Sequence, residues 1–571
     1  MKNSNYEKYL MNGEMDMMKT GAEIIVEVLV EEGVDVVFGY PGGTVINIYD
    51  ALLQNKDRIR HILTAHEQGA SHAADGYARA TGKTGVVIAT SGPGATNIVT
   101  GIATAYMDSI PMVAITGNVT TDAMGRDSFQ EVYIAGVTLP ITKHNFLVKN
   151  IEDLADTLRE AFRIAQSGRP GPVLVDIPKD LTIASYEFEH KEIVRSQHHV
   201  PVKEDDIKHL AKLINKSVRP VIYFGGGVIS SRASRELSEL INTCSIPACH
   251  TLMATGVLSY GDRLNLGMVG MHGHVSSSKA INEADLLIAI GTRFSDRVAT
   301  NKEKFASNAI KVQIDIDDTE IDKNVRTNFS ILGDVKDVIV GLMKYVQPSE
   351  RKEWIETIDK WREEIDYHPV DDENTIKPFK LVEAISELSG EDAIIVTDVG
   401  QHQMWTAQYC KRTKPRSFLT SGGLGTMGFS YGASIGAKIA YPERRVVHIT
   451  GDGSFHMNLN ELCTSVTYEL PIITVIMNNQ VLGMVRQWQE LFFEKRYAYT
   501  TLDRKTNYVK LAEAFGAKGY RATTVTEFKK AFEQALQNTN CPSVIECIID
   551  RDEKVLPMIP PGGSFDDIIV D

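Results

Sequence analysis

The chain has 571 residues with 60 basic and 74 acidic side chains, giving a formal net charge of −14. An acidic protein of this kind is an unlikely partner for nucleic acid, because nucleic-acid-binding surfaces are normally basic. The hydrophobic and charged fractions, 43% and 23%, are ordinary for a globular protein, and no apolar run approaches the ~18 residues of a membrane span. The six cysteines include no CxxC pair, which argues against a zinc site or disulfide framework. We expect reduced thiols, a cytoplasmic location and three or four domains.

Residues 1–18 carry no apolar core of a secretory signal and no Arg/Ser-rich transit pattern. We therefore expect a short leader before a first domain that starts near Lys19. Beyond it, short β-branched apolar runs alternate with helical patterns. In chain order, the predicted strands are Val34–Phe38, Val86–Ala89, Val113–Thr116, Val173–Asp176, Val221–Phe224, Leu286–Ile290, Val312–Ile316, Ile394–Thr397, Val446–Ile449, Ile472–Met477 and Ser543–Ile549.

Continuous apolar strands that alternate with helices are typical of parallel sheets covered on both faces. The strands fall into three groups, so the sequence predicts an α/β protein of three doubly wound parallel-sheet domains. The predicted boundaries are a leader (1–18), a first domain (19–185), a linker (186–204), a central domain (205–345), a second linker (346–376), a third domain (377–550) and a C-terminal tail (551–571).

Glycine-rich turns follow several predicted strands, and ligands of open parallel sheets bind at these carboxyl ends. The turns are Gly39–Gly43, Ser91–Gly94, Gly225–Gly227, Asp398–Gln401 and Gly451–Gly453. Exposed backbone amides in such turns suit phosphate groups, so we expect phosphate-bearing ligands in more than one domain.

Three partial motifs are rejected. Residues 423–428 fit GxGxxG without following a clear strand, and Tyr77 stands where a Walker loop at 77–84 needs glycine. His66-Glu67 lacks the second histidine of a zinc helix, since that position is Ala70.

The strongest chemical signal joins Gly451-Asp452-Gly453-Ser454 to Asn478-Asn479. Asp452 and Asn479 each follow an apolar strand, and neighbouring parallel strands would bring the two side chains together. One carboxylate and one amide oxygen suit Mg²⁺ that also keeps diphosphate oxygens as ligands. A lone GDG would more often be an ordinary polar turn, whereas GDG with NN at this separation resembles the metal and diphosphate motif of thiamine-diphosphate enzymes.

The resemblance to thiamine-diphosphate enzymes extends over nearly the whole chain. Residues 65–70 (AHEQGA), 73–79 (AADGYAR) and 91–97 (SGPGATN) resemble the pyrimidine-binding part of that family. There, the glutamate that matches Glu67 hydrogen-bonds the cofactor's pyrimidine ring and drives its imino tautomer. Without this context Glu67 would more often be a solvated helix residue. The match implies metal binding by Asp452, Asn479 and the carbonyl of Val481, and cofactor contacts by Pro41, Gly42, Pro93, Asn97, Val399, Gly400, Gln401, His402, Gly425, Met427, Gly451, Gly453 and Ser454.

Within that superfamily, residues 399–405 (VGQHQMW) and 421–428 (SGGLGTMG) resemble the catalytic subunits of acetohydroxyacid (acetolactate) synthases. The match places Met427 beneath the cofactor as the bulky residue that forces its bent form; the alternative is a core methionine. The second segment also explains the partial GxGxxG match.

The central domain resembles the flavin-binding domain of the same family, and the resemblance implies a structural FAD that takes no part in electron transfer. Each segment alone is weak, and their order and spacing carry the prediction. The implied FAD residues are Arg169, Gly225, Gly226, Gly227, Thr251, Leu252, Met253, Met271, His272, Gly273, Gly291, Arg293, Asp315, Ile316, Asp334 and Val335.

The substrate pocket is also carried over from the family. Arg297 would pair with a 2-keto acid carboxylate, and Met484, Val485 and Trp488 would wall the side-chain pocket of the second substrate. Phe129, Gln130 and Lys143 match further positions, Gln130 and Lys143 with a catalytic role. The alternatives are a partly buried helix tryptophan for Trp488 and a solvated lysine for Lys143.

The resemblance implies that the chain decarboxylates pyruvate and joins the remaining two-carbon unit to a second pyruvate, giving 2-acetolactate, or to 2-ketobutyrate, giving 2-aceto-2-hydroxybutyrate. These are entry steps of branched-chain amino-acid biosynthesis. It also implies a homodimer or homotetramer with active sites at the subunit interface, and allows a small regulatory subunit. A flavin-dependent pyruvate oxidase, or another decarboxylase or carboligase of the superfamily, stays an alternative. A non-catalytic homologue is disfavoured, because Glu67, Asp452 and Asn479 are all present.

Two residues depart from the family pattern. Asn118 stands where glutamine is usual, and Val481 occupies a variable position expected to use only its carbonyl. Neither change removes a catalytic group.

Overall fold

The computed structural model describes residues 17–193, 201–371 and 375–570. The predicted leader lies outside these residues except for Met17 and Met18. The described residues form two compact units: unit 1 comprises 17–75 and 84–193, and unit 2 comprises 76–83 and the described residues from 201 on. None of the helices in the described part of the chain is long and apolar enough to cross a membrane.

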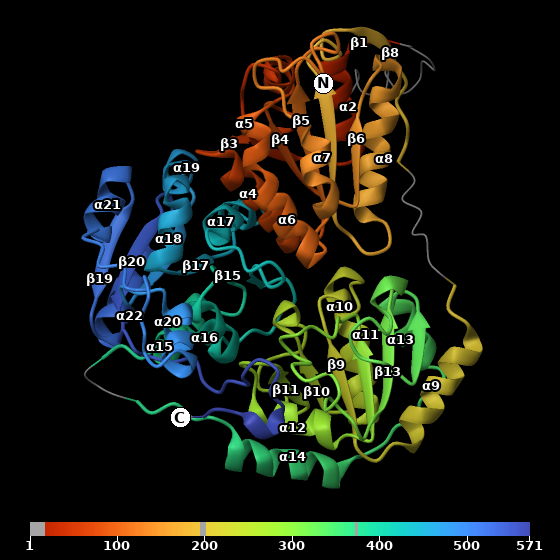
Figure 1. Ribbon diagram of the computed structural model, residues 1–571, viewed down its shortest axis with the longest axis vertical. Coiled ribbons are helices and arrows are strands. Elements are labelled where there is room, and N and C mark those ends of the chain that lie inside the picture. Colours follow the sequence, from red (N-terminus) through yellow and green to blue (C-terminus); the bar gives the residue numbers. More distant parts are fainter. Residues whose placement is uncertain (1–16, 194–200, 372–374, 571) are drawn as a thin grey trace, which may run out of the picture. The chain divides into compact units, whose positions relative to one another are not determined.

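Unit 1 is built on one parallel six-stranded sheet with the strand order β3-β2-β4-β5-β7-β6 (Figure 1). Its strands are β2 (Val36–Tyr40), β3 (Arg60–Leu63), β4 (Gly85–Ala89), β5 (Met112–Asn118), β6 (His144–Leu147) and β7 (Pro172–Pro178). Its helices are α2 (Gly21–Glu31), α3 (Ile46–Gln54), α4 (Glu67–Thr81, of which the last residues belong to unit 2), α5 (Pro93–Asn97), α6 (Val99–Asp108), α7 (Ile134–Thr138) and α8 (Leu154–Gln166).

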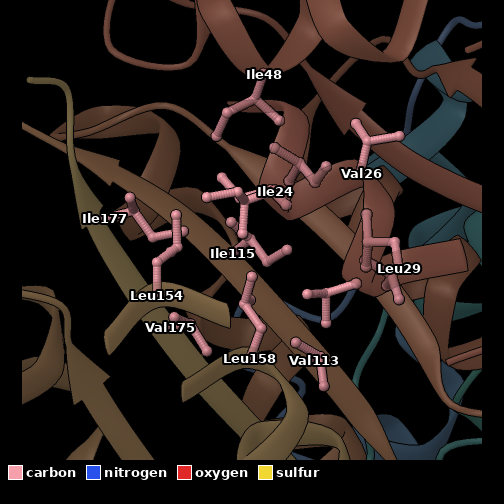
Figure 2. Close-up of a cluster of buried hydrophobic side chains, with 14 of the residues drawn as sticks. Ile24, Val26, Leu29, Ile48, Val113, Ile115, Leu154, Leu158, Val175 and Ile177 are labelled. Atoms are coloured by element: carbon pink, nitrogen blue, oxygen red, sulfur yellow. The ribbon is translucent and has the colours of Figure 1, made fainter. Parts of the chain in front are cut away.

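The core of unit 1 lies between this sheet and helices α2 and α8 (Figure 2). Helix α2 begins where Thr20 and Glu23 form a capping box, which satisfies backbone N–H groups at the helix start. Its apolar residues, such as Ile24 and Leu29, are fully buried against strand residues such as Ile115. Each such side chain contributes about 1.5–3 kcal/mol by leaving water.

A short antiparallel pair, β1 (Met17–Thr20) with β8 (Ser185–Phe188), adjoins this core. Strand β8 lies across the start of the predicted linker 186–204, and its Phe188 is buried in the core cluster of unit 1. That part of the segment therefore packs as part of unit 1.

The central sheet, in unit 2, is also parallel, with the order β11-β10-β9-β12-β13-β14. Its strands are β9 (Pro220–Phe224), β10 (Ala248–His250), β11 (Asn265–Met268), β12 (Leu286–Ile290), β13 (Ile310–Asp315) and β14 (Phe329–Leu332). The accompanying helices are α9 (Glu204–Lys216), α10 (Gly227–Ser230), α11 (Ser234–Cys244), α12 (Val275–Glu283), α13 (Val335–Leu342) and α14 (Lys352–Ile365).

Helix α14 lies in the predicted linker 346–376 and is packed against the central domain. The indole nitrogen of Trp354 donates a 3.2 Å hydrogen bond to Pro220 O, and its ring meets Trp361 edge-on. Trp354 is buried in a hydrophobic cluster of the central domain, so this segment contributes to the core.

The third sheet is parallel with the order β16-β15-β17-β18-β20-β19. Its strands are β15 (Ile394–Thr397), β16 (Phe418–Leu419), β17 (Val446–Gly451), β18 (Ile472–Asn478), β19 (Lys518–Ala522) and β20 (Ser543–Ile548). Its helices are α15 (Pro378–Ser389), α16 (Gln401–Tyr409), α17 (Phe429–Ala440), α18 (Asp452–Asn458), α19 (Leu462–Thr467), α20 (Gly483–Phe492), α21 (Tyr508–Phe515) and α22 (Val525–Leu536). Three parallel sheets flanked by helices confirm the predicted fold class.

Candidate cofactor and substrate site

The register of the third sheet gathers the predicted metal and diphosphate residues at one edge. Thr397 on β15 pairs with Ile449 on β17, and Gly451 pairs with Met477 on β18. The segments that begin at Val399, Gly451 and Asn479 therefore leave three neighbouring strands at their carboxyl ends. Parallel sheets bind ligands at this edge.

Asp452 is the first residue of α18 and is almost fully buried. Burial raises the pKa of its carboxyl group to about 6, although its own backbone and those of Gly453 and Asn479 donate hydrogen bonds that oppose the rise. A buried carboxylate is costly without a positive partner, and a bound cation would supply one.

Asn479 and Val481 complete the oxygen donors predicted for the metal. The amide oxygen of Asn479 accepts a 3.2 Å hydrogen bond from the backbone of Val481, so the two residues form a tight turn. One carboxylate, one amide oxygen and one carbonyl suit a hard cation such as Mg²⁺. Within the described residues no three His, Cys, Asp or Glu side chains gather as a metal site. A metal held here would thus take further ligands from diphosphate and water.

His402, on α16, presents a buried polar atom, Nε2, that has no hydrogen-bond partner among the described residues. Burial lowers the pKa of the ring to about 3, so the imidazole is neutral. A side chain on Gly400 would come within 2.9 Å of this ring, and one on Gly451 within 3.1 Å. Both glycines therefore leave room for the histidine, and its unsatisfied nitrogen fits an anionic ligand such as a diphosphate.

Met427 lies in the loop before α17, and a buried polar network anchors that loop. Asp398 accepts hydrogen bonds from the backbone of Gly428 (2.9 Å) and from the backbone and hydroxyl of Ser430. The Ser430 hydroxyl also lies 2.6 Å from Nε2 of His448. A Cβ on Gly453 would lie 3.9 Å from the Met427 methyl, which places that methyl beside the Gly451–Gly453 turn.

Helix α20 carries the predicted substrate pocket residues. Val485, Trp488 and Phe492 follow helical spacing, and the Trp488 and Phe492 rings meet edge-on at 5.5 Å. Val485 and Phe492 are exposed, whereas Met484 is partly buried against the core of the third domain. The helix thus offers an open apolar face that follows the Asn479–Val481 turn in the chain.

Unit 1 holds the pyrimidine-side residues at the ends of β2, β3 and β4. Glu67 starts α4, and its Oε2 accepts a 3.0 Å hydrogen bond from Nδ2 of Asn97 on α5. A side chain on Gly94 would lie 3.2 Å from Oε1 of Glu67. Pro93 opens α5, where its missing N–H is tolerated. Gly42 is tightly packed, since a Cβ there would meet the Thr90 side chain at 2.4 Å.

The three remaining residues predicted from unit 1 lie in different surroundings. Phe129 is 88% exposed. Gln130 has a positive φ of 62° and packs against Gly92. The Lys143 amine donates to the carbonyls of Ile164 and Ser167 at the end of α8, where a cation is favourable. Lys143 thus caps the carbonyl groups at the end of α8, and its catalytic role stays a prediction.

The residues predicted to bind FAD lie mostly at the carboxyl edge of the central sheet. Phe224, His250, Ile290 and Ile314 pair in register, so the segments after these strands emerge together. They are Gly225–Gly227 after β9, Thr251–Met253 after β10, Gly291–Arg293 after β12, Asp315–Ile316 at the end of β13 and Asp334–Val335 after β14.

At the carboxyl edge of the central sheet, close approach to the backbone of Gly291 requires glycine at positions 225 and 227. A Cβ on Gly227 would come within 2.6 Å of Gly291 Cα, and one on Gly225 within 2.7 Å of Gly291 O. At Gly226 the nearest atom to such a Cβ would be Met253 Cβ, at 3.4 Å. Gly225 and Gly227 are therefore tightly packed, whereas Gly226 between them has more space around it. Such a backbone surface fits a flat or phosphate-bearing ligand.

The remaining residues predicted to bind flavin or substrate in unit 2 lie in two loops, at 271–273 and at Arg297. Met271 N donates to Arg297 O at 2.7 Å, which joins the 271–273 segment to the loop of the predicted carboxylate-binding arginine. The Arg297 side chain is 63% exposed. His272 is buried and bonded through Nδ1 to Pro557 O, and burial lowers its pKa to about 4. Arg169, in unit 1, donates to the Ser109 hydroxyl.

Models of known protein families match the sequence over most of the chain. Models of thiamine pyrophosphate enzymes match the N-terminal TPP binding domain at residues 19–137, the central domain at 207–342 and the C-terminal TPP binding domain at 398–547. A probable acetolactate synthase large subunit of Methanocaldococcus jannaschii is 46% identical over 572 residues, covering 96% of this chain and 95% of that protein. The chain belongs to the acetolactate synthase large-subunit family.

Other members of the family agree. The acetolactate synthase large subunit of Mycobacterium tuberculosis is 46% identical, covering 96% of this chain and 91% of its own length. The isozyme 1 large subunit of Escherichia coli K12 is 43% identical, with 96% and 97% covered. Family membership confirms the predicted enzyme class, a thiamine-diphosphate-dependent carboligase.

The sequence gives no role to several buried polar residues that form hydrogen bonds around this candidate site. Ser430, His448 and Gln487 were not singled out, and Asp398 entered only as part of a turn. For Ser430 and His448 the available signal is a polar side chain inside a largely apolar helix or strand, and it does not say which partner the side chain meets.

Proposed function

We propose that the chain converts two pyruvates into one 2-acetolactate and one CO₂, with one proton taken up, and that 2-ketobutyrate can replace the second pyruvate. The observation that carries the proposal is the pair of prepared half-sites in a member of the acetolactate synthase family. Glu67 with Asn97 forms one of them. Asp452, Asn479 and His402, whose buried Nε2 has no hydrogen-bond partner within the described part of the chain, form the other. We further propose thiamine diphosphate with Mg²⁺ as the reacting cofactor and FAD as a structural one.

In this proposal, proton transfer and the binding of metal and diphosphate fall to different residues. Oε2 of Glu67 is held by Asn97, so Oε1, which faces Gly94, is the atom that accepts or returns the cofactor's proton. Asp452, Asn479 and the Val481 carbonyl would hold Mg²⁺, and neutral His402 would donate to the diphosphate. When bound, thiamine diphosphate supplies the electron sink for decarboxylation.

The substrates would meet residues of α20 and the loop at Arg297. The Arg297 guanidinium is exposed and would pair with the carboxylate of an incoming 2-keto acid. The apolar face of Val485 and Trp488 would exclude water from the acceptor and contact its alkyl group. Keeping protons away from the reacting centre favours carbon–carbon bond formation over release of an aldehyde.

We also propose that the chain acts as at least a homodimer, because enzymes of this family complete each cofactor site with two chains. The relatives are named as large subunits, which supports a second, smaller subunit as a partner.

The decisive experiment supplies pyruvate, thiamine diphosphate, Mg²⁺ and FAD to the purified protein and measures 2-acetolactate and CO₂. We expect a ratio of one to one. Glu67→Gln should abolish turnover even at saturating cofactor, while Glu160→Gln, an exposed carboxylate of the same unit, should not. Near-wild-type turnover of Glu67→Gln would refute the assignment.

The alternative is a pyruvate oxidase, in which the flavin accepts electrons. Stopped-flow absorbance distinguishes the two reactions. Bleaching of the flavin at the catalytic rate after pyruvate is added would favour the oxidase, whereas an unbleached flavin during steady turnover supports the carboligase.

A further inference from the structure

Asn479 must offer its oxygen, and not its NH₂ group, to a metal ion. The two ends of an amide are nearly equal in size, so something has to fix which end faces the metal. In the structure, Nδ2 of Asn479 lies 3.4 Å from Oε1 of Gln401, the first residue of α16. The contact requires glycine at 483, because a Cβ there would lie 1.9 Å from Gln401 Oε1 and 2.9 Å from Asn479 Nδ2.

The orientation of Gln401 is fixed in turn by two acceptors. Its Nε2 donates to the backbone oxygen of Glu553 at 2.8 Å and to Oε1 of Gln487 at 3.1 Å. A flipped Gln401 would place its oxygen against both acceptors and its NH₂ group against that of Asn479. Gln401 is buried, so these mismatches would have no water to relieve them.

Gln487, in the middle of α20, is held by the main chain of the C-terminal segment. Its Oε1 accepts from Val555 N at 2.9 Å, and its Nε2 donates to Val555 O at 3.1 Å. Gln487 is only 3% exposed. A backbone N–H and C=O cannot exchange places, so Val555 dictates which end of the Gln487 amide points toward Gln401.

Two other side chains, Trp405 and Gln408, hold this C-terminal segment in place independently of Gln487 and Gln401. Trp405 Nε1 donates to Lys554 O at 3.3 Å, and Gln408 Nε2 donates to Leu556 O at 3.0 Å and to His272 O at 2.9 Å. The backbone that Gln487 contacts therefore has its own anchors on α16.

We propose that residues 553–555 orient the metal-binding amide of Asn479 through Gln487 and Gln401, which act as positioning residues. Every link pairs a donor with an acceptor: Val555 N to Gln487 Oε1, Gln401 Nε2 to that same oxygen, and Asn479 Nδ2 to Gln401 Oε1. Nδ2 of Asn479 is thus occupied by Gln401, while Oδ1 accepts from Val481 N at 3.2 Å, and both contacts leave Oδ1 as the atom that would bind the metal. The inference rests on the metal site in the proposed function and adds that the C-terminal segment sets its affinity.

The test measures Mn²⁺ binding to the full-length protein with thiamine diphosphate present, by electron paramagnetic resonance of free Mn²⁺. Gln487→Met keeps the length of the side chain and removes its hydrogen bonds to Gln401 and to the backbone of Val555. We expect Mn²⁺ affinity to fall ~10-fold, the range seen when partners of metal ligands are lost. Gln408→Met is the matched control, since Gln408 bonds to the same segment without reaching Asn479, and its affinity should change less than about twofold.

An Asn479→Asp background isolates orientation from stability, because a carboxylate offers an oxygen at either end. There, Gln487→Met should change the affinity less than about twofold. Gln487→Asn, which retains an amide too short to reach both partners, should reproduce the loss if Gln487→Met unfolds, as thermal melting would reveal.

Three results would overturn the inference: unchanged affinity in a folded Gln487 variant, an equal loss in the Asn479→Asp background, or an equal loss in Gln408→Met. Failure of the proposed function looks different, because the wild-type protein would then not bind Mn²⁺ with thiamine diphosphate at all.

Discussion

The side-chain amide of Asn97 donates a 3.0 Å hydrogen bond to Oε2 of Glu67. This contact joins the start of α4 to the end of α5, so two elements that follow different strands fix one carboxylate. Under the proposed function it leaves Oε1 as the atom that exchanges a proton with the cofactor.

We therefore expect Asn97→Ala to lower kcat with little change in KM for pyruvate, because the carboxylate loses its orientation but pyruvate loses no contact. The loss should be ~10-fold, below the ~10²-fold or more of losing a proton-transfer group. Steady-state kinetics at saturating cofactor measures it. Thr96→Ala, on the same helix and with its hydroxyl bonded to Pro93 O, is the control. An equal effect of both variants would assign the loss to α5 and not to Glu67.

The apolar face of α20 predicts the acceptor preference. Trp488→Leu removes an aromatic ring that packs on Phe492, and we expect the ratio of 2-aceto-2-hydroxybutyrate to 2-acetolactate to fall. Competition between pyruvate and 2-ketobutyrate with product identification measures the ratio. An unchanged ratio would remove Trp488 from the pocket.

The Asp398 network predicts a positioning role for Ser430. Ser430→Ala removes the hydroxyl that bridges Asp398 and His448, which should loosen the loop carrying Met427. We expect slower hydrogen–deuterium exchange at C2 of bound thiamine diphosphate, with cofactor affinity changed less. Ser434→Ala, one turn along α17 and with its hydroxyl bonded to Ser430 O, should leave the exchange rate unaltered. If both serine variants slow exchange equally, α17 packing and not the network is responsible.

The glycine edge of the central sheet predicts a contrast between two adjacent substitutions. Gly227→Ala would push a methyl group into Gly291 Cα at 2.6 Å, whereas Gly226→Ala meets Met253 Cβ at 3.4 Å. The first change should cost about 1–3 kcal/mol through overpacking, and the second much less. Thermal melting of the flavin-free protein compares them. Equal midpoints would contradict the close backbone contact.

A buried carboxyl in unit 1 predicts a dependence of stability on pH. Asp176, on β7, accepts hydrogen bonds from Thr116 and Asn118, and burial raises its pKa to about 7. The folded protein thus binds a proton that the unfolded chain releases near pH 4. The free energy of unfolding should consequently fall as pH rises from about 4 to 7, by at most about 1.4 kcal/mol per pH unit.

Asp176→Asn should flatten this dependence, because asparagine keeps the shape of the protonated acid and does not ionise. Calorimetric melting of both proteins between pH 5 and pH 8 provides the measurement. A slope that persists in the variant would assign the dependence to another group. The same contact gives the departure at Asn118 a structural meaning, as its amide is used by Asp176.

The sequence by itself determined nearly all interior strands of the three sheets. Every interior strand except β10 was predicted, and the missed strands are otherwise at sheet edges or in the β1–β8 pair. Interior strands are buried on both faces and give unbroken apolar runs. Edge strands such as β3 (Arg60–Leu63) and β19 (Lys518–Ala522) are polar and partly exposed, and β10 has only three residues. Those patterns resemble loops.

The sequence also determined which strand ends carry chemistry, because Asp452 and Asn479 each follow an apolar run, and β17 and β18 are neighbours in register. Only the tertiary structure decided the rest. It placed Lys143 on the carbonyls of α8, brought Val555 to Gln487 across 68 residues, and gave each amide between Val555 and Asn479 one orientation. Local residue patterns reflect burial and periodicity, whereas these partners are set by packing between segments far apart in the chain.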